Sequence, residues 1–582
     1  MSAHSPQRAG ERRLTRAFFG LLAIVYFGVF PYLQEVNNPN ENSRTYLVLA
    51  LVDHHTFRLD EVARRYGWTN DLARVPEPGG GTHLAAVKGP WMSLIGAPVY
   101  AAERAVLAAV GKRPPTATAG QAAHQRWLRT TTIVLQLFCA HLPGYLFLVW
   151  LERRMRAWSS DATLRLATVA AVGLGTNFLA YSLLFVSHAW SATAAFVALE
   201  LVRDAAGRRA PSAREAFVAG CWVSLSALLE YQGVFVALPL GLWAGWVFRR
   251  RLGALALAVA TSALPLLWVQ WASFGHPLAT GHRHMQTEAF AGLWREGVLG
   301  FTGLDREALG GLLFDRGYGF FGTSPFFWTL ALLPLALWLG VERRARDAAL
   351  VGVATALVVT LAMASSRMWR GGWTIGPRYL GALPGLLAPA ALVALDALAT
   401  RGLATVARGL AVGLAAASFL QIGALSLLVT TLPESIVRPV PQIVAPLLAL
   451  GLAPHHAGEL VGAGGVEPFK LALAAPLGCL ALALFAAGRE HATARAALAV
   501  VVAALALRPA LTLPAGARDD GPAVRGYFYT VWEPKGRDRL SAAWARAAEG
   551  PCAHREIGRY LQVIGRAREA EAHARLGAAC GR

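Results

Sequence analysis

The chain has 582 residues, of which 55% are hydrophobic and 15% charged, and a formal net charge of +20. Soluble domains carry about 25% charged residues, so this composition indicates a membrane protein. Many of the arginines lie in short clusters between apolar runs, as the positive-inside rule predicts for cytoplasmic loops. That distribution argues against a nucleic-acid-binding protein.

The N-terminal part of the chain predicts a membrane helix followed by a long outer loop. Residues 1–16 are polar and basic, and no small-residue cleavage site follows the apolar run 17–33. We therefore expect a cytoplasmic N-terminus and a retained membrane helix. The next clearly spanning run begins near residue 127, which predicts a first outer loop over residues 34–126.

Two apolar stretches of this loop do not read as membrane spans. The apolar residues 46–52 are too few to cross about 30 Å of hydrocarbon, so they predict an amphipathic helix lying along the membrane face. The stretch 91–110 is interrupted by Pro98, Glu103 and Arg104, which predicts an interfacial or re-entrant segment.

The remaining apolar runs predict membrane helices that alternate in direction. If residues 1–16 are cytoplasmic, the Arg clusters between the runs are cytoplasmic too, and the longest loops are outside. This arrangement predicts an all-α polytopic protein of the inner (plasma) membrane, with about 13 transmembrane helices over residues 17–513. Its further outer loops are 272–325 and 433–470, and a mostly helical tail, 514–582, is extracytoplasmic. After 17–33, the expected spans are approximately 127–151, 163–185, 188–202, 215–229, 231–248, 252–271, 326–341, 348–364, 379–399, 409–432, 471–487 and 495–513.

The five cysteines show no metal-binding spacing. Three of them, Cys139, Cys221 and Cys479, fall in apolar runs and are expected to be small core residues. Cys552 and Cys580 lie in the tail, where either a disulfide or two free thiols is compatible with the sequence.

Three outer segments, 37–90, 271–325 and 367–378, are rich in polar, aromatic and Gly residues. No predicted span carries a clear ionisable residue at its middle, whereas ion-coupled transporters usually have one. We therefore expect the functional site at the outer membrane interface, where a lipid-linked substrate and a water-soluble one can meet.

The first outer segment offers an acid and a cation. Glu41, beside Asn40 and Arg44, is the candidate general base for an acceptor hydroxyl. Alternatively, it is a carboxylate that stabilises a helix N-terminus. Lys88, in the sequence Lys88-Gly89-Pro90, is either a cation that faces a phosphate or a snorkelling lysine at the membrane edge.

The most distinctive segment is RGGWTIGPRY, residues 370–379. Its Gly and Pro residues favour a sharp turn, and Arg378 is expected on the side that the positive-inside rule disfavours for arginine. Such an arginine indicates a bound anion, for which a lipid phosphate is the obvious candidate, or a structural role against loop carbonyls. Residues 316–325 (RGYGFFGTSP) form a similar loop. The predicted phosphate contact from these loops is Arg370, and the predicted cavity residues are Tyr318, Trp373, Tyr379 and, from another loop, His188.

The order of these motifs over residues 15–400 resembles bacterial glycosyltransferases of the C fold, including the protein O-mannosyltransferase and aminoarabinose transferase group. In that group a carboxylate of the first outer loop, usually in an Asp-Glu pair, is the general base. Asn40-Glu41 matches the pair, which implies that Glu41 is the base and that Asn40 is a departure. Lys88-Gly89-Pro90 is similar to the family's Lys-Pro-Pro, which implies contact with the donor phosphate. The family's further Asp in the second outer loop has no match, since residues 177–190 offer His188 and no carboxylate.

The resemblance implies an inverting transfer of a sugar from a polyprenyl-phosphate donor to an acceptor on the extracytoplasmic face. The acceptor is a lipid, a glycan or a protein, and the use of a divalent metal is left open. Two alternatives remain open as well: a transporter or flippase of lipid-linked sugars, and a catalytically inactive scaffold of the same fold.

Overall fold

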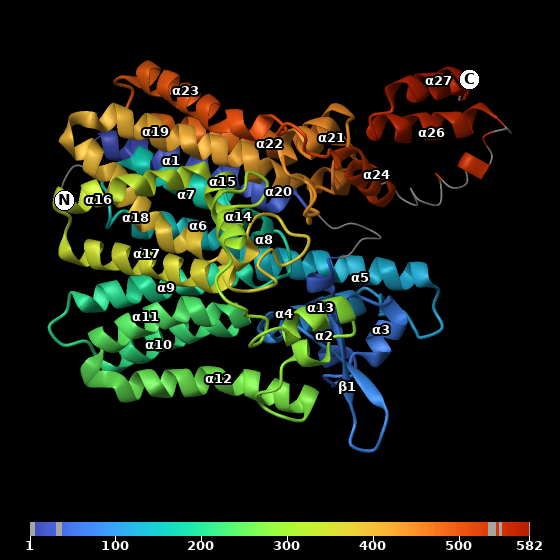
Figure 1. Ribbon diagram of the computed structural model, residues 1–582, viewed down its shortest axis with the longest axis horizontal. Helices are drawn as coiled ribbons and strands as arrows, with labels where there is room; N and C mark the ends of the chain where they lie inside the picture. The colour runs from blue at the N-terminus through green and yellow to red at the C-terminus, as the bar shows by residue number, and fades with distance from the viewer. Residues whose placement is uncertain are drawn as a thin grey trace.

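The computed structural model describes residues 6–30, 38–532, 540, 543–545, 547 and 550–580, and this part of the chain is mostly helical (Figure 1). One group of helices, which includes most of the long apolar ones, forms a bundle. They are α1 (Pro6–Gly28), α5 (Gln121–Gln136), η1 (Leu137–His141), α6 (Leu142–Met155), α7 (Ala162–Leu174), α8 (Asn177–Ser182), α9 (His188–Ala206), α10 (Ala213–Leu228), α11 (Val234–Val247), α12 (Leu252–Phe274), η5 (Pro325–Leu332), α16 (Leu333–Trp338), α17 (Arg343–Ala364), α18 (Leu383–Leu398), α19 (Ala404–Ser418), α20 (Ala424–Leu428), α22 (Val466–Phe485) and α23 (Ala492–Leu511).

A second group of elements lies at one end of the bundle. They are α2 (Pro39–Asp53), α3 (Asp60–Tyr66), α4 (Trp91–Ala109), η2 (Tyr231–Gly233), η4 (Gly281–His284), α13 (Glu288–Arg295), α14 (Arg306–Phe314), α15 (Phe320–Thr323), η6 (Arg378–Leu380), η9 (Val440–Val444), α21 (Ala445–Ala449), η10 (Ala457–Val461) and α24 (Gly521–Trp532). The strands β1 (Leu72–Pro76) and β2 (Thr82–Ala86) form an antiparallel hairpin, in which Leu72 pairs with Ala86.

Several helices of the described chain are long and apolar enough to cross a membrane. The six stretches that meet both conditions are Gln121–Met155, Arg249–Phe274, Arg343–Ala364, Leu383–Leu428, Val466–Phe485 and Ala492–Leu511. Shorter apolar helices occur at Ala162–Leu174, Tyr231–Val247, Pro325–Trp338 and Val440–Ala449. The expectation of an α-helical membrane protein is therefore confirmed, whereas the count of about 13 spans stays a prediction.

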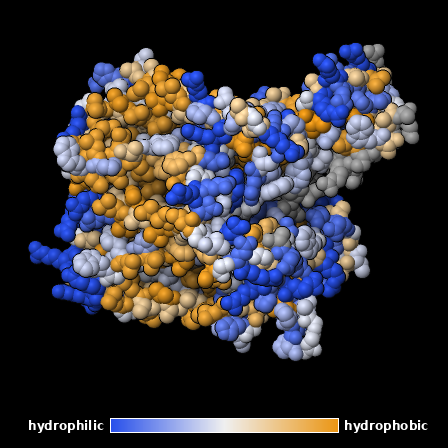
Figure 2. Space-filling model, viewed as in Figure 1, coloured by the Kyte–Doolittle hydropathy of each residue, from blue (hydrophilic) through white to orange (hydrophobic). Residues whose placement is uncertain are grey.

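An apolar surface covers much of the bundle (Figure 2). On α11 and α12 this surface includes the exposed side chains of Leu242, Trp246, Leu257 and Trp268. Hydrophilic residues lie beyond it, at the left edge and over the right half of the view. A soluble monomer rarely exposes so large an apolar area, and a lipid bilayer is the environment that suits it.

The two ends of the bundle differ in character (Figure 1). The N-terminus, the basic segment η3 (Arg249–Arg251) and the start of α17, which carries Arg343, Arg344 and Arg346, lie at the left end. The hairpin and the short loop helices lie at the other end. The sequence placed these groups on opposite sides of the membrane, and which side is cytoplasmic stays a prediction.

Helix α2 corrects the expectation of an amphipathic helix on the membrane surface. Every residue from Asn40 to Ala50 is buried, and α2 packs against α4 and α3. A helix with no exposed face cannot lie on a membrane surface through one apolar side. The polar residues of its first turns, 40–44, are therefore buried inside the protein.

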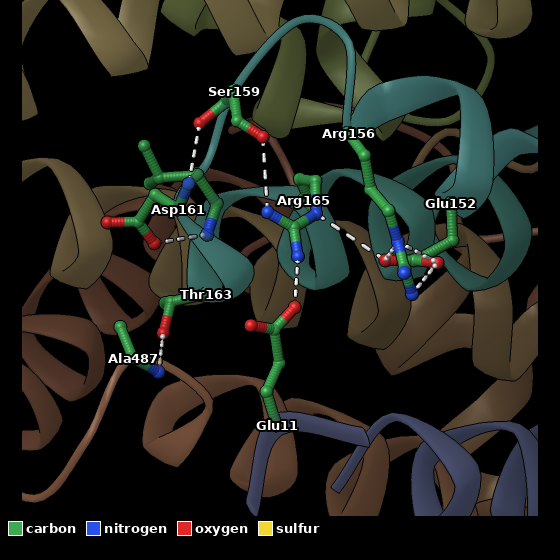
Figure 3. Close-up of polar contacts among 9 residues, drawn as sticks. Glu11, Glu152, Arg156, Ser159, Asp161, Thr163, Arg165 and Ala487 are labelled. Atoms are coloured by element: carbon green, nitrogen blue, oxygen red, sulfur yellow. Dashed lines mark hydrogen bonds and ion pairs between the residues drawn. The ribbon is translucent and has the colours of Figure 1, made fainter. Parts of the chain in front are cut away.

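Buried ionic contacts tie together the helix ends near the N-terminus (Figure 3). Arg165 of α7 is 3% exposed, and its guanidinium contacts Glu11 of α1, the Ser159 carbonyl (3.1 Å) and Glu152 of α6 (3.4 Å). Nearby, Asp161 caps the N-terminus of α7 and accepts a hydrogen bond from Arg408 (2.7 Å). These contacts fix α1, α6, α7 and α19 relative to one another at this end of the bundle.

The described part of the tail is helical and cross-linked. Helices α26 (Pro551–Val563) and α27 (Ala567–Gly577) form a hairpin, and Cys552 is bonded to Cys580. Of the two alternatives left open by the sequence, the structure therefore has the disulfide. Disulfides persist in oxidising compartments, which fits an extracytoplasmic tail.

We predict that Arg165→Met destabilises the protein by about 2 kcal/mol, because it removes the charged donors that contact Glu11, Glu152 and the Ser159 carbonyl, although Glu152 keeps its contact with Arg156 (2.9 Å). Thermal unfolding of the purified protein in detergent measures the effect. Arg343→Met, the same change at a side chain that is 85% exposed, is the control and should leave the unfolding midpoint unchanged. Equal midpoints for the two variants would contradict the role given to Arg165.

We also predict that the tail is labelled from outside the cell only after reduction. In a variant without the three other cysteines, a membrane-impermeant maleimide added to intact cells should react with Cys552 and Cys580 after a reducing agent, and not before. An added cysteine at the opposite end, Arg343→Cys, should stay unlabelled until the membrane is opened. The reverse pattern would invert the predicted topology.

Candidate functional site

A cavity of about 490 Å³ lies at the loop end of the molecule, and all three of the polar outer segments line it. The first segment contributes Asn40 and Lys88, the second contributes His282 and Trp294, and the third contributes the loop that ends at Arg378. Lys88 and Arg378, the two cations expected to contact one phosphate, line this same cavity, whereas Glu41, the acid expected beside them, does not.

The second segment is held against the β-hairpin by backbone contacts. Met285 forms an isolated bridge with Ala73 of β1, and the Gln286 amide donates to the Leu72 carbonyl (3.1 Å). Gly281 lies so close to the chain that a Cβ there would be 2.5 Å from the Cα of Val87. This close approach brings His282 into the cavity wall next to Lys88.

The third segment turns sharply, as its glycines predicted. Gly371 has a φ of +72°, and a Cβ at this position would lie 2.6 Å from Nε of Arg378. The loop is fastened to α8 by two hydrogen bonds, from the Asn177 amide to the Pro377 carbonyl (3.0 Å) and from the Tyr181 hydroxyl to the Ile375 carbonyl (3.3 Å). Glycine at 371 thus leaves the space that the Arg378 guanidinium occupies.

The two cations of the cavity have different partners. Nζ of Lys88 lies 3.2 Å from a carboxylate oxygen of Asp71. The guanidinium of Arg378 stacks on the Tyr379 ring at 5.0 Å and donates to its hydroxyl (3.3 Å), while Nε is buried and has no hydrogen-bond partner. Among the residues that the structure describes, no carboxylate pairs with Arg378.

Arg44 and His188 belong to a buried cluster beside the cavity. Arg44 is 1% exposed and donates to Ser187 (2.7 Å) and to Glu230 (2.8 Å), which lies between α10 and α11. The His188 ring lies 3.6 Å from the same carboxylate and lines two small pockets together with Arg378. Burial acts to raise the pKa of Glu230, but the neighbouring His188 and Arg44 outweigh it and lower that pKa to about 2.

Glu41 faces away from the cavity. One of its carboxylate oxygens accepts hydrogen bonds from Gln136 Nε2 (2.8 Å) and from the Phe185 amide (2.6 Å). Burial raises the pKa of this carboxyl to about 7, although both hydrogen bonds act in the opposite direction. Its neighbour Asn40 lines the cavity instead. The role of Glu41 as general base stays a prediction, and its surroundings are those of a packed structural group.

Of the other expected site residues, some line the cavity and some do not. Trp373 and Tyr379 line the cavity. Arg370 lies over the rings of Tyr318 and Trp369, at 4.9 and 5.2 Å, and the Tyr318 hydroxyl donates to the Arg370 carbonyl (2.6 Å). This pair supports the loop behind the cavity wall and does not line the cavity.

Sequence reasoning missed several polar residues at the site, above all Asp71, Glu230 and His282. Glu230 had a signal, because it is the one charged residue in the short link between two expected spans. Asp71 had none, since it becomes a cavity residue only through the folding of the hairpin. In the described part of the chain, no three His, Cys, Asp or Glu side chains gather in a metal-binding group.

Comparison with known proteins assigns the chain to no family. No protein-family model matches the chain, and no curated protein matches it either. The site therefore has to be interpreted from its own geometry.

We predict that the free energy of unfolding falls as the pH rises, because the buried carboxyl of Glu41 must then lose its proton. The unfolded carboxyl, with a pKa of about 4.5, releases its proton before the buried one does at about 7, so the folded state loses about 3 kcal/mol between these pH values. Glu41→Gln keeps an oxygen for both hydrogen bonds and has no proton to lose. The thermal unfolding midpoint of Glu41→Gln, minus that of the wild type, should therefore increase from pH 5 to pH 8. A difference that does not change with pH would contradict this prediction.

Proposed function

We propose that the protein is a membrane glycosyltransferase that moves a sugar from a polyprenyl-phosphate donor to an acceptor at the extracytoplasmic face. The donor phosphate binds between Lys88 and Arg378, in the cavity at the loop end of the bundle.

The unpaired guanidinium of Arg378 carries this proposal. Buried or partly buried charges in proteins are normally paired, because removing a charge from water is costly. Among the residues described, Arg378 meets only an aromatic ring and a hydroxyl, and it borders an open cavity. Lys88 lines the same cavity with a single acidic partner, Asp71. An anionic ligand with several oxygens, such as a phosphodiester or a phosphate, would supply charged hydrogen-bond acceptors to both cations.

An apolar groove supports a lipid-linked form of this anion. A groove of about 370 Å³ lies between α10, α11 and α12, and its lining includes Leu228, Val234 and Leu242. Gly89, next to Lys88, packs against the backbone of Leu228 and Leu229. A hydrocarbon chain lying in this groove would therefore end close to Lys88, as a polyprenyl chain attached to the bound phosphate requires.

The chemistry expected of such a site is electrostatic. When the bond between the sugar and the phosphate breaks, negative charge increases on the phosphate oxygens. Lys88 and Arg378 then stabilise the departing group more strongly than the intact donor, which lowers the barrier to transfer. Trp373 and Trp294 provide apolar ring faces in the same cavity, where a sugar ring can pack.

We predict that Lys88→Met and Arg378→Met each weaken donor binding by about 1.5–3 kcal/mol, or roughly 10- to 100-fold, because each removes a charged hydrogen-bond donor from the phosphate. The measurement is native mass spectrometry of the purified protein with a synthetic polyprenyl phosphate. Two matched substitutions at exposed cations, Lys112→Met and Arg74→Met, should bind as the wild type does.

The activity itself is tested with extracted membrane lipids as the donor pool. Membranes that contain the protein should consume one lipid-phosphate sugar, identified by mass spectrometry, whereas membranes without it should not. A wild-type protein that neither consumes such a lipid nor binds polyprenyl phosphate would refute the proposal.

A further inference from the structure

A sugar transfer to a hydroxyl needs a group that removes the hydroxyl proton, and the cavity offers few candidates. Asn40 projects from α2 into the cavity, but an amide does not accept a proton at neutral pH. Glu41 is turned away, toward Gln136 and Phe185. The carboxylates that line the cavity, among the residues described, are Asp71 and Glu434.

Asp71 is built into the site more firmly than Glu434. It is 9% exposed, and its carbonyl accepts hydrogen bonds from the Ser43 hydroxyl (2.8 Å) and from the Val87 amide (3.3 Å). The residue is therefore fixed between α2 and β2. The side chain of Glu434 is 49% exposed, and it lies 3.8 Å from Arg370, at the edge of the cavity.

The surroundings of Asp71 suit a proton acceptor. One carboxylate oxygen is 3.2 Å from Lys88, and no hydrogen bond to the other oxygen occurs within the described chain. Its charge also acts on Arg44 and Arg378. Glu230, which lines a small pocket together with Arg378, is a poor base because its pKa lies near 2.

We propose that Asp71 is the catalytic base of the transfer, a role that rests on the proposed function. Asp71 accepts the proton of the acceptor hydroxyl while the hydroxyl oxygen forms a bond to C1 of the sugar. The bond from C1 to the phosphate oxygen breaks with its electron pair, which stays on polyprenyl phosphate between Lys88 and Arg378. The proton on Asp71 later passes to water.

The test compares carboxylate-to-amide variants in the full-length protein. Asp71→Asn should lower the transfer rate with the lipid extract at least about 100-fold, the usual contribution of a general base. Its binding of synthetic polyprenyl phosphate should stay the same or become tighter, because Lys88 loses its competing anion. Asp71→Glu, which keeps a carboxylate, should recover part of the rate. Asp60→Asn, a change outside the cavity in the same outer loop, is the matched control and should transfer normally.

The result that overturns the assignment is clear. If Asp71→Asn transfers sugar within threefold of the wild-type rate, Asp71 is not the base, and loss of transfer in Glu41→Gln would then return that role to Glu41. If Asp71→Asn binds no polyprenyl phosphate while the wild type does, Asp71 serves donor binding instead. Failure of the proposed function is distinct, because there the wild type itself neither binds nor consumes the donor.

Discussion

The site depends on the buried ion pair between Arg44 and Glu230. Arg44 lies on α2, near the start of the first outer segment, and Glu230 lies between α10 and α11 of the bundle, so their contact of 2.8 Å fixes the outer segment to the bundle. Arg44 also donates to the carbonyl of Asn40 (3.1 Å), which holds the start of α2 at the cavity. Removing one partner of such a pair costs about 3–5 kcal/mol, because the other charge stays buried without compensation.

The contrast between Arg44 and Arg378 separates a cation with structural partners from the cation to which we assign the phosphate. Both lie deep at the same end of the protein. Arg44 has a carboxylate, a hydroxyl and a carbonyl, which satisfy most of its donors. Arg378 has a ring and a hydroxyl but, among the described residues, no carboxylate, whereas a buried Nε without an acceptor is common to both arginines. Arg44 is held in place by its hydrogen-bond partners. Arg378 is held in place by its loop, and its guanidinium still has donors that a ligand can use.

The sequence predicted the helical membrane class, because hydropathy and charge follow directly from residue type. It failed at α2, where an apolar run bounded by charges suggested a surface helix. The run is buried instead, because α4, α3 and β2 pack against it, and sequence periodicity does not reveal such packing partners. The approach of Asp71 to Lys88 depends in the same way on the hairpin register, which pairs Leu72 with Ala86.

The difference between Asn40 and Glu41 shows why a motif alone could not locate the base. Successive helix residues point about 100° apart, so only one of two neighbours can face a given cavity. Here the amide faces the cavity and the carboxylate faces the core. An acid in the cavity must then come from another element, and Asp71 lies beside the cation that we assign to the phosphate. Because Lys88 can pair with Asp71 or with a phosphate, arrival of the donor would draw this cation from the carboxylate and leave Asp71 free to accept a proton. Donor binding and base activation would then be coupled through one lysine.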